Sequence, residues 1–212
     1  TLTRQKLNKE KSLISFVGAP WTLLVYMFGL KKSKDKLDLP KFKKKEQEMR
    51  EILEKLSEYL CIHIKQQIKA GADVVQVFDS WAGLIPKKKL SHFCFKPNLK
   101  IVKYCKKINT PIICFPKGIK GNYKKFNNLV RPNALNLDSE VNPAWAKINL
   151  KNVVLQGGID PRVLLKSEKK MYKTVKKYLD TFHNVPYIFN LGHGLIPETK
   201  IEKLEKLINF VR

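Results

Sequence analysis

The chain alternates short apolar runs with longer amphipathic segments, and this alternation constrains its fold more than any other feature. Six apolar runs predict buried strands, and the segments between them place apolar residues at three- and four-residue steps, which predicts helices. Strands alternating with helices indicate an α/β fold with a parallel sheet. The strands are expected at residues 13–17, 73–80, 111–115, 134–138, 153–157 and 187–191, and the main helices at 41–69, 99–107, 123–130, 143–148, 167–182 and 200–210.

Polar or glycine-containing segments follow these strands, and in a (β/α)8 TIM barrel the active site is built from the loops at that end. A complete barrel has eight strands and about 250 residues. Six strands in 212 residues therefore predict an incomplete TIM barrel, folded as a single domain over residues 1–212, that lacks its first two βα units. The chain begins with Thr1 rather than Met, so we expect residues to precede it. Neither a G-x-G-x-x-G nor a G-x-x-x-x-G-K sequence supports a dinucleotide fold or a P-loop.

The charge is strongly positive, with 42 Lys and Arg against 18 Asp and Glu, a formal net charge of +24. Such a charge attracts anionic ligands, whether nucleic acid, lipid or a polycarboxylate, and does not choose among them. Only five of the basic residues are Arg, and the Lys residues are spread along the chain, which is also typical of solvated helix faces.

Residues 13–30 carry no charge and reach the length of a membrane span. Gly18 and Pro20 interrupt the stretch, so we expect a strand, a turn and a short helix rather than a span. The four cysteines show no C-x-x-C spacing, which gives no support for a disulfide scaffold or a zinc ribbon. A reduced, cytoplasmic setting is therefore expected.

Three strand ends carry groups that can do chemistry. His193 lies between Gly192 and Gly194, in a loop where it could donate to a carboxylate or move a proton, or simply face solvent. Asp79 and Ser80 follow another strand, and either could act in a site or cap a helix.

The third strand end is the turn at residues 18–22, which predicts a helix with Tyr26 one turn after Thr22. Tyr26 could belong to a site or to the core. Asp160 and Pro161 predict a helix start, with Asp160 as its cap.

Four segments, read in order, resemble the uroporphyrinogen decarboxylase family, and the resemblance runs through nearly the whole chain. They are GAPWTL at 18–23, FDSWAG at 78–83, QGGIDP at 156–161 and NLGHG at 190–194. The resemblance implies a (β/α)8 barrel, a homodimer, and no metal or organic cofactor. It also implies an activity: decarboxylation of the four acetate side chains of uroporphyrinogen III to give coproporphyrinogen III.

The resemblance also implies roles for four residues. Tyr26 matches the family's active-site tyrosine and His193 its cleft histidine, so both are expected to be catalytic and to bind substrate. Phe78 and Ser80 match cleft residues that bind substrate. The side chains suit these roles, because Tyr26, Ser80 and His193 can donate hydrogen bonds to carboxylates, and Phe78 offers an apolar wall.

The chain departs from the family pattern in three ways. It lacks the arginine-rich N-terminal segment that meets substrate carboxylates, and it lacks the aspartate, in the first barrel strand's loop, that binds the pyrrole N–H groups. Asp79 belongs to another loop and does not replace that aspartate. Gly158 stands where the family usually has Asn. We therefore expect the parent protein to be an active decarboxylase and these 212 residues alone to be inactive.

Three other functions are open. A zinc-dependent corrinoid methyltransferase of the same superfamily needs a His-x-Cys pair and a later Cys, but Ile112 replaces the His and no Cys follows Cys114. A basic nucleic-acid-binding protein is disfavoured by the scarcity of Arg and the dispersal of Lys. The third alternative is a tetrapyrrole-binding protein that has lost catalysis. The presence or absence of the pyrrole-binding aspartate in the preceding part of the protein would decide it.

Overall fold

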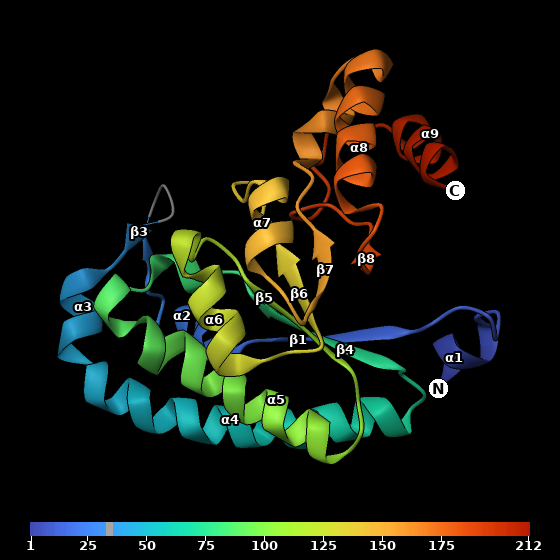
Figure 1. The fold of residues 1–212 in the computed structure, drawn as a ribbon. Helices are drawn as coiled ribbons and strands as arrows, with labels where there is room; N and C mark the ends of the chain where they lie inside the picture. Colours follow the sequence, from blue (N-terminus) through green and yellow to red (C-terminus); the bar gives the residue numbers. More distant parts are fainter. Residues whose placement is uncertain (33–35) are drawn as a thin grey trace. The chain divides into compact units, whose positions relative to one another are not determined.

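The computed structural model describes residues 1–32 and 36–212 (Figure 1). Helices alternate with six strands that pair in parallel, so the α/β class is confirmed. The chain forms two compact units, residues 1–135 and 136–212, and each is described by itself. The expectation of a single domain stays a prediction.

The first unit holds the parallel strands in the order β1-β4-β5-β6, with Val17 of β1 opposite Val77 of β4, and Val77 opposite Cys114 of β5. Helices α4 and α5 pack against each other alongside this sheet (Figure 1). A small antiparallel pair of strands, β2 with β3, follows α2. The elements of this unit are α1 (Leu2–Lys6), β1 (Ile14–Gly18), α2 (Pro20–Met27), β2 (Lys31–Lys32), β3 (Lys36–Leu37), α3 (Leu39–Lys44), α4 (Glu46–Lys69), β4 (Val74–Asp79), α5 (Lys96–Lys107), β5 (Ile112–Pro116), α6 (Tyr123–Val130) and the first half of β6 (Ala134–Leu137).

Three aromatic rings anchor the helical layer of the first unit. Trp21 of α2, Phe42 of α3 and Phe93 meet edge to face, with ring centroids 5.1 to 5.9 Å apart, and all three are buried. Large rings in this arrangement bury much apolar surface and also gain from their quadrupoles. They fix α2 and α3 to the π-helical turn Ser91–Phe95, which leads into α5.

The helix expected over residues 41–69 is in fact two helices, so that prediction was wrong at its start. Asp38 caps α3 by accepting a hydrogen bond from the Lys41 N–H at 3.2 Å. The chain leaves helical geometry at Lys45 (φ −111°, ψ 12°) before α4 begins. Phe42, just before the break, packs into the aromatic cluster, a tertiary contact that helical periodicity does not encode.

The second unit contains the rest of β6, then α7 (Pro143–Asn149), β7 (Val154–Gly157), α8 (Glu168–Phe182), β8 (Tyr187–Ile188) and α9 (Ile201–Val211). Strands β6, β7 and β8 are neighbours in that order, and Phe182 stacks on Tyr187 with ring centroids 4.3 Å apart. The strand expected at 187–191 is shorter than predicted. Gly157 and Gly158 take positive φ angles at the end of β7, so only an isolated bridge from Ile159 to Leu191 continues the ladder.

The charge-free stretch at residues 13–30 divides into β1, a turn and α2, as expected. Across the residues that the structure describes, no helix has both the length and the apolar character needed to cross a membrane.

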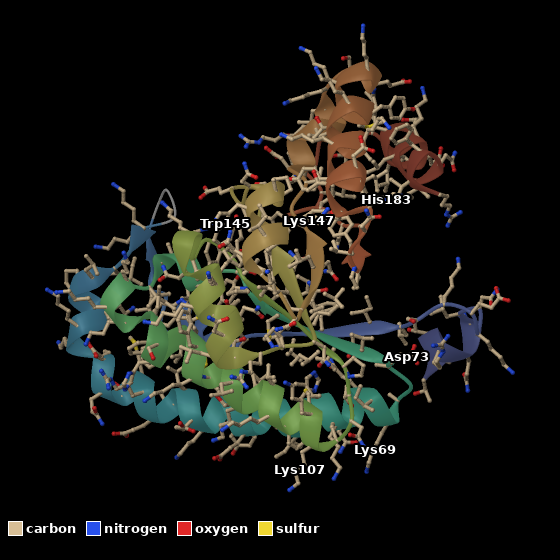
Figure 2. The ribbon with its side chains drawn as sticks, in the orientation of Figure 1. Lys69, Asp73, Lys107, Trp145, Lys147 and His183 are labelled. Carbon is tan, nitrogen blue, oxygen red and sulfur yellow. The ribbon has the colours of Figure 1, made fainter. Side chains whose placement is uncertain are left out.

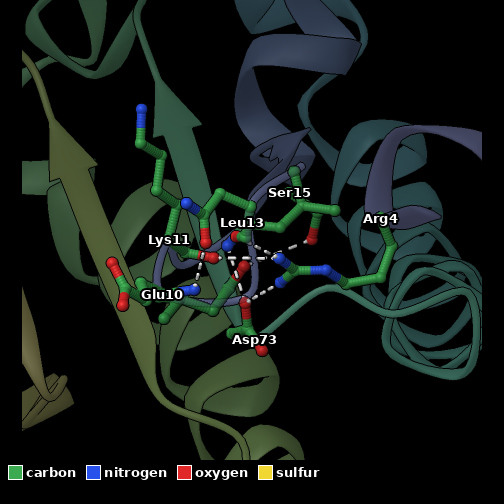
Figure 3. A network of polar contacts seen from close by, with 8 residues as sticks. Arg4, Glu10, Lys11, Leu13, Ser15 and Asp73 are labelled. Carbon is green, nitrogen blue, oxygen red and sulfur yellow. Dashed lines mark hydrogen bonds and ion pairs between the residues drawn. The ribbon is translucent and has the colours of Figure 1, made fainter. Parts of the chain in front are cut away.

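A polar network joins the N-terminal helix to the sheet of the first unit (Figure 3). The Arg4 guanidinium donates to Asp73 Oδ2 at 2.9 Å and to the carbonyls of Asn8 and Lys11 at 3.1 and 3.0 Å. Asp73 Oδ2 also accepts the Leu13 N–H at 2.6 Å. Figure 2 shows Asp73 on the side of this unit where α4 and α5 end, at Lys69 and Lys107. Asp73 therefore ties α1 to the starts of β1 and β4.

Replacing Arg4 with Met should lower the free energy of unfolding by about 1 kcal/mol, because a partly exposed charge-assisted pair contributes about that much. Urea unfolding of the two proteins measures the difference. Lys6→Met on the same helix makes an equal change in charge and should leave the midpoint unchanged. Equal effects of the two substitutions would contradict the assignment.

Candidate active site

The turn after β1 places α2 against the end of β4. The Ala19 N–H donates to the Phe78 carbonyl at 2.9 Å, and Pro20 occupies the first position of α2. Trp21 and Thr22 are buried, whereas Tyr26, one turn later, is 64% exposed. The sequence left open whether Tyr26 belongs to the core, and its exposure shows that it does not.

The turn after β4 gathers the other expected site residues of the first unit. Phe78 is half-buried, edge-on to Phe16 and Phe115 at centroid distances of 5.8 and 6.0 Å. Ser80 is half-buried, and the next residue, Trp81, meets the Tyr26 ring at 6.3 Å. Tyr26, Phe78 and Ser80 therefore lie at the carboxyl ends of β1 and β4, where a barrel builds its active site.

A chain of hydrogen bonds holds this turn in place. The Thr22 hydroxyl donates to Asp79 Oδ1 at 3.0 Å and accepts the Trp81 N–H at 3.3 Å. The Trp21 indole N–H donates to the Trp81 carbonyl at 2.8 Å, so α2 contacts the turn through both Trp21 and Thr22. The position of Ser80 relative to α2 is thereby fixed on both sides.

Asp79 is the buried centre of these contacts, with none of its surface exposed. Asn98 Nδ2, on α5, donates to Asp79 Oδ2 at 3.2 Å. Burial raises the pKa of Asp79 to about 6, against hydrogen bonds from Cys94, Thr22 and Asn98 that lower it. The alternative that Asp79 caps a helix is wrong, because its carboxyl accepts from side chains of two other helices.

His193 belongs to the second unit and is exposed. The Gly194 N–H donates to His193 Nδ1 at 2.8 Å, so a neutral ring carries its proton on Nε2. Gly192 packs against the backbone after β6, where a Cβ atom would lie 2.7 Å from the Ser139 nitrogen. Only glycine fits there, which explains the glycine before His193. The convergence of His193 with Tyr26 and Ser80 stays a prediction.

The loop after β7 also depends on backbone shape. Gly158 has a φ of +102°, and a Cβ atom there would lie 3.1 Å from Tyr178 Cε1. Tyr178 donates its hydroxyl proton to the Gly158 carbonyl at 2.8 Å. Asp160 caps the short 3-10 helix Pro161–Leu165 by accepting the Arg162 N–H at 2.9 Å, so the expected helix start is confirmed.

Two site-supporting residues were missed from the sequence. In the sequence, Asn98 is one polar position within a helix and Thr22 is part of a turn motif. No local pattern indicates that either residue contacts Asp79. Their partners are 19 and 57 residues away along the chain.

The zinc alternative finds little support at Cys114. Its side chain is fully buried in β5, and burial raises the thiol pKa far above its ordinary value. Among the described residues, no three His, Cys, Asp or Glu side chains gather into a group that could hold a metal ion.

Comparison with known proteins decides the family. The sequence model described as uroporphyrinogen decarboxylase (URO-D) matches residues 1–212. The chain belongs to the uroporphyrinogen decarboxylase family. A uroporphyrinogen decarboxylase of Orientia tsutsugamushi strain Ikeda is 37% identical over 220 residues, covering 100% of this chain and 63% of that protein. One from Wolbachia pipientis wMel is 36% identical over 211 residues, covering 99% and 62%.

The chain thus spans 62 to 63% of the length of these relatives. A methyltransferase from Methanosarcina mazei superposes with a TM-score of 0.80 at 15% identity, covering 99% of this chain and 60% of that one. At that identity the match shows the fold alone. It confirms the expected α/β fold of the TIM-barrel type, with six parallel strands in the part of the chain that the structure describes.

The raised pKa of Asp79 predicts a pH-dependent stability. A carboxyl whose folded pKa exceeds its unfolded value stabilises the fold fully below the unfolded pKa, and this stabilisation is lost as pH rises through the folded pKa. The free energy of unfolding should therefore fall between pH 4 and pH 6, by at most about 3 kcal/mol. Asp79→Asn should flatten this fall, as measured by urea unfolding across the pH range.

Asp160→Asn is the matched control for that experiment. Hydrogen bonding to Arg162 lowers the pKa of Asp160, so its contribution has the opposite sign and acts at lower pH. The control should keep the fall between pH 4 and pH 6. A profile that Asp79→Asn does not change would show that Asp79 does not titrate in this range.

The close approach at Gly192 predicts that Gly192→Ala is destabilising. The added methyl group must displace the backbone near Ser139, at a cost of about 1 to 3 kcal/mol. Thermal or urea unfolding gives the value. Gly194→Ala is the control, because no atom lies within 4 Å of a Cβ atom at that position. Equal stability of the two variants would refute the close packing at Gly192.

Proposed function

We propose that the whole protein carrying these residues removes the four acetate carboxyl groups of uroporphyrinogen III to give coproporphyrinogen III, in porphyrin and haem biosynthesis. The observation that carries the proposal is family membership over all 212 residues. The placement of Tyr26, Phe78 and Ser80 at adjacent strand ends supports it.

The proposed reaction needs no cofactor, because the pyrrole ring accepts the electron pair. Protonation of a pyrrole carbon makes the ring electron-poor. The bond between the acetate CH2 and its carboxylate then breaks, CO2 leaves, and the electron pair passes into the ring. Protonation of the resulting methylene gives a methyl group, and loss of the first proton from the ring carbon restores the aromatic pyrrole. The protein supplies position, charge complementarity and a dry environment for these steps.

Each residue has a part that suits its surroundings. The exposed Tyr26 hydroxyl and the Ser80 hydroxyl donate to substrate carboxylates. Phe78, in contact with Phe16 and Phe115, forms an apolar wall for the flat macrocycle. His193 donates through Nε2 and is the candidate for proton transfer.

The proposed partners are the tetrapyrrole and a second copy of the whole protein, in a cytoplasmic homodimer without nucleic acid. Figure 2 shows side chains that end in nitrogen on helices of both units, which agrees with positive charge spread along the chain. The family's arginine-rich segment and pyrrole-binding aspartate have no match in these residues. We therefore propose that residues 1–212 alone do not catalyse the reaction.

Coproporphyrinogen formation by the whole protein tests the proposal. Tyr26→Phe should lower kcat/KM about 10- to 100-fold, because it removes a hydrogen bond to a charged group. His193→Asn should lower it by at least as much, through the loss of proton transfer. Tyr59→Phe, an exposed tyrosine of α4, and His183→Asn should leave the rate unchanged.

Two results would count against the proposal. One is a folded whole protein that forms no coproporphyrinogen. The other is product formation that the Tyr26 and His193 variants lower no more than their controls do, which would remove these residues from the site.

A further inference from the structure

A cavity of about 400 Å³ lies in the first unit, between the loop after β4 and the loop after β5. Its lining begins at Ala82, two residues after Ser80, and continues on the other side with residues 118–122. One side of its lining therefore continues along the chain from the turn that carries Ser80, a proposed substrate-binding residue. Its volume is in the range of small-molecule sites.

Two glycines join the loops that enclose the cavity. Gly83 and Gly118 pack backbone to backbone, and a Cβ atom on Gly83 would lie 3.0 Å from the Gly118 carbonyl oxygen. The Gly83 N–H donates to the Lys117 carbonyl at 2.9 Å. Gly118 takes a φ of +78°, which other residues rarely adopt. The cavity is thus built by close backbone contact rather than left by loose loops.

The charges around the cavity have one sign. Lys87 and Lys120 line it, and no acidic residue does. Neither lysine forms an ion pair within the described part of the chain, whereas the neighbouring Lys89 is held by Glu46 at 2.7 Å. Lys87 and Lys120 are therefore available to an external anion.

Three apolar side chains, Ile85, Leu90 and Ile119, line the cavity together with glycines and Asn122. All three are buried, so each presents only a small apolar surface. Apolar walls beside two cations suit a carboxylate carried on a short alkyl stem better than a fully hydrated inorganic anion.

We propose that this cavity binds one carboxyalkyl side chain of the tetrapyrrole substrate, with Lys87 and Lys120 pairing with its carboxylate. The inference rests on the proposed function and adds two specificity-determining residues to it. Uroporphyrinogen carries eight carboxylates, and only one acetate reacts at a time, so the others need cationic partners. These lysines hold the ring while Tyr26 and Ser80 meet the reacting side.

The test uses the whole protein with Lys87→Met and Lys120→Met, singly and together. Binding of uroporphyrin, the oxidised octacarboxylate ring, is followed by quenching of tryptophan fluorescence, and KM and kcat are measured with uroporphyrinogen. Each single substitution should raise Kd and KM about three- to fivefold, which is the loss of affinity expected when a partly exposed ion pair is removed. The value of kcat should change less than twofold.

Lys88→Met and Lys124→Met are matched controls, because both lysines are exposed neighbours that do not line the cavity. They remove the same charge and should change Kd by less than 1.5-fold, about the lower limit for a surface ion pair. Inorganic phosphate at millimolar concentration should not displace the porphyrin, which separates a carboxyalkyl site from a general anion site.

Three results would overturn the inference: no binding of uroporphyrin, binding that Lys87→Met and Lys120→Met leave unchanged, or equal weakening by the control lysines. Failure of the proposed function is a different result, in which the porphyrin binds but no coproporphyrinogen forms. The Kd comparison can be read in either case.

Discussion

The carboxyl group of Asp79 lies where β4, α2 and α5 meet, and the first unit's candidate site depends on how it is satisfied. A fully buried carboxyl is costly unless hydrogen-bonded, and here Thr22 and Asn98 both donate to it. Thr22 in turn accepts the Trp81 N–H. One buried acid therefore sets the distance between the helix that carries Tyr26 and the turn that carries Ser80.

Close backbone contact has the same effect in the loops. Gly83 against Gly118 shapes the cavity in the first unit, and Gly192 against the backbone near Ser139 positions His193 in the second. Both arrangements leave no space for a side chain, so chain segments approach more closely than packed side chains allow. The polar groups of the sites are thus carried by rigid turns, which lowers the entropy cost of binding a ligand.

Much of the fold followed from the sequence, because it depends on local periodicity. Helix α6 begins and ends where residues 123–130 predicted, and the five predicted strands β1, β4, β5, β6 and β7 differ from their expected bounds by at most one residue at either end. The short strands β2 and β3 were not predicted. The errors lie where distant contacts decide. Phe42, beside the break in the long helix, packs on Trp21 and Phe93, which are distant in the sequence.

The sequence by itself determined the α/β class and the order of the elements, since apolar spacing is a local property of the chain. Its resemblance to a known family also predicted Tyr26, Phe78, Ser80 and His193 as site residues. Only the tertiary structure decided that Asp79 is a buried, hydrogen-bonded acid rather than a helix cap, and that Lys87 and Lys120 line one cavity. Burial and charge pairing depend on which distant segments meet, and local spacing does not specify that.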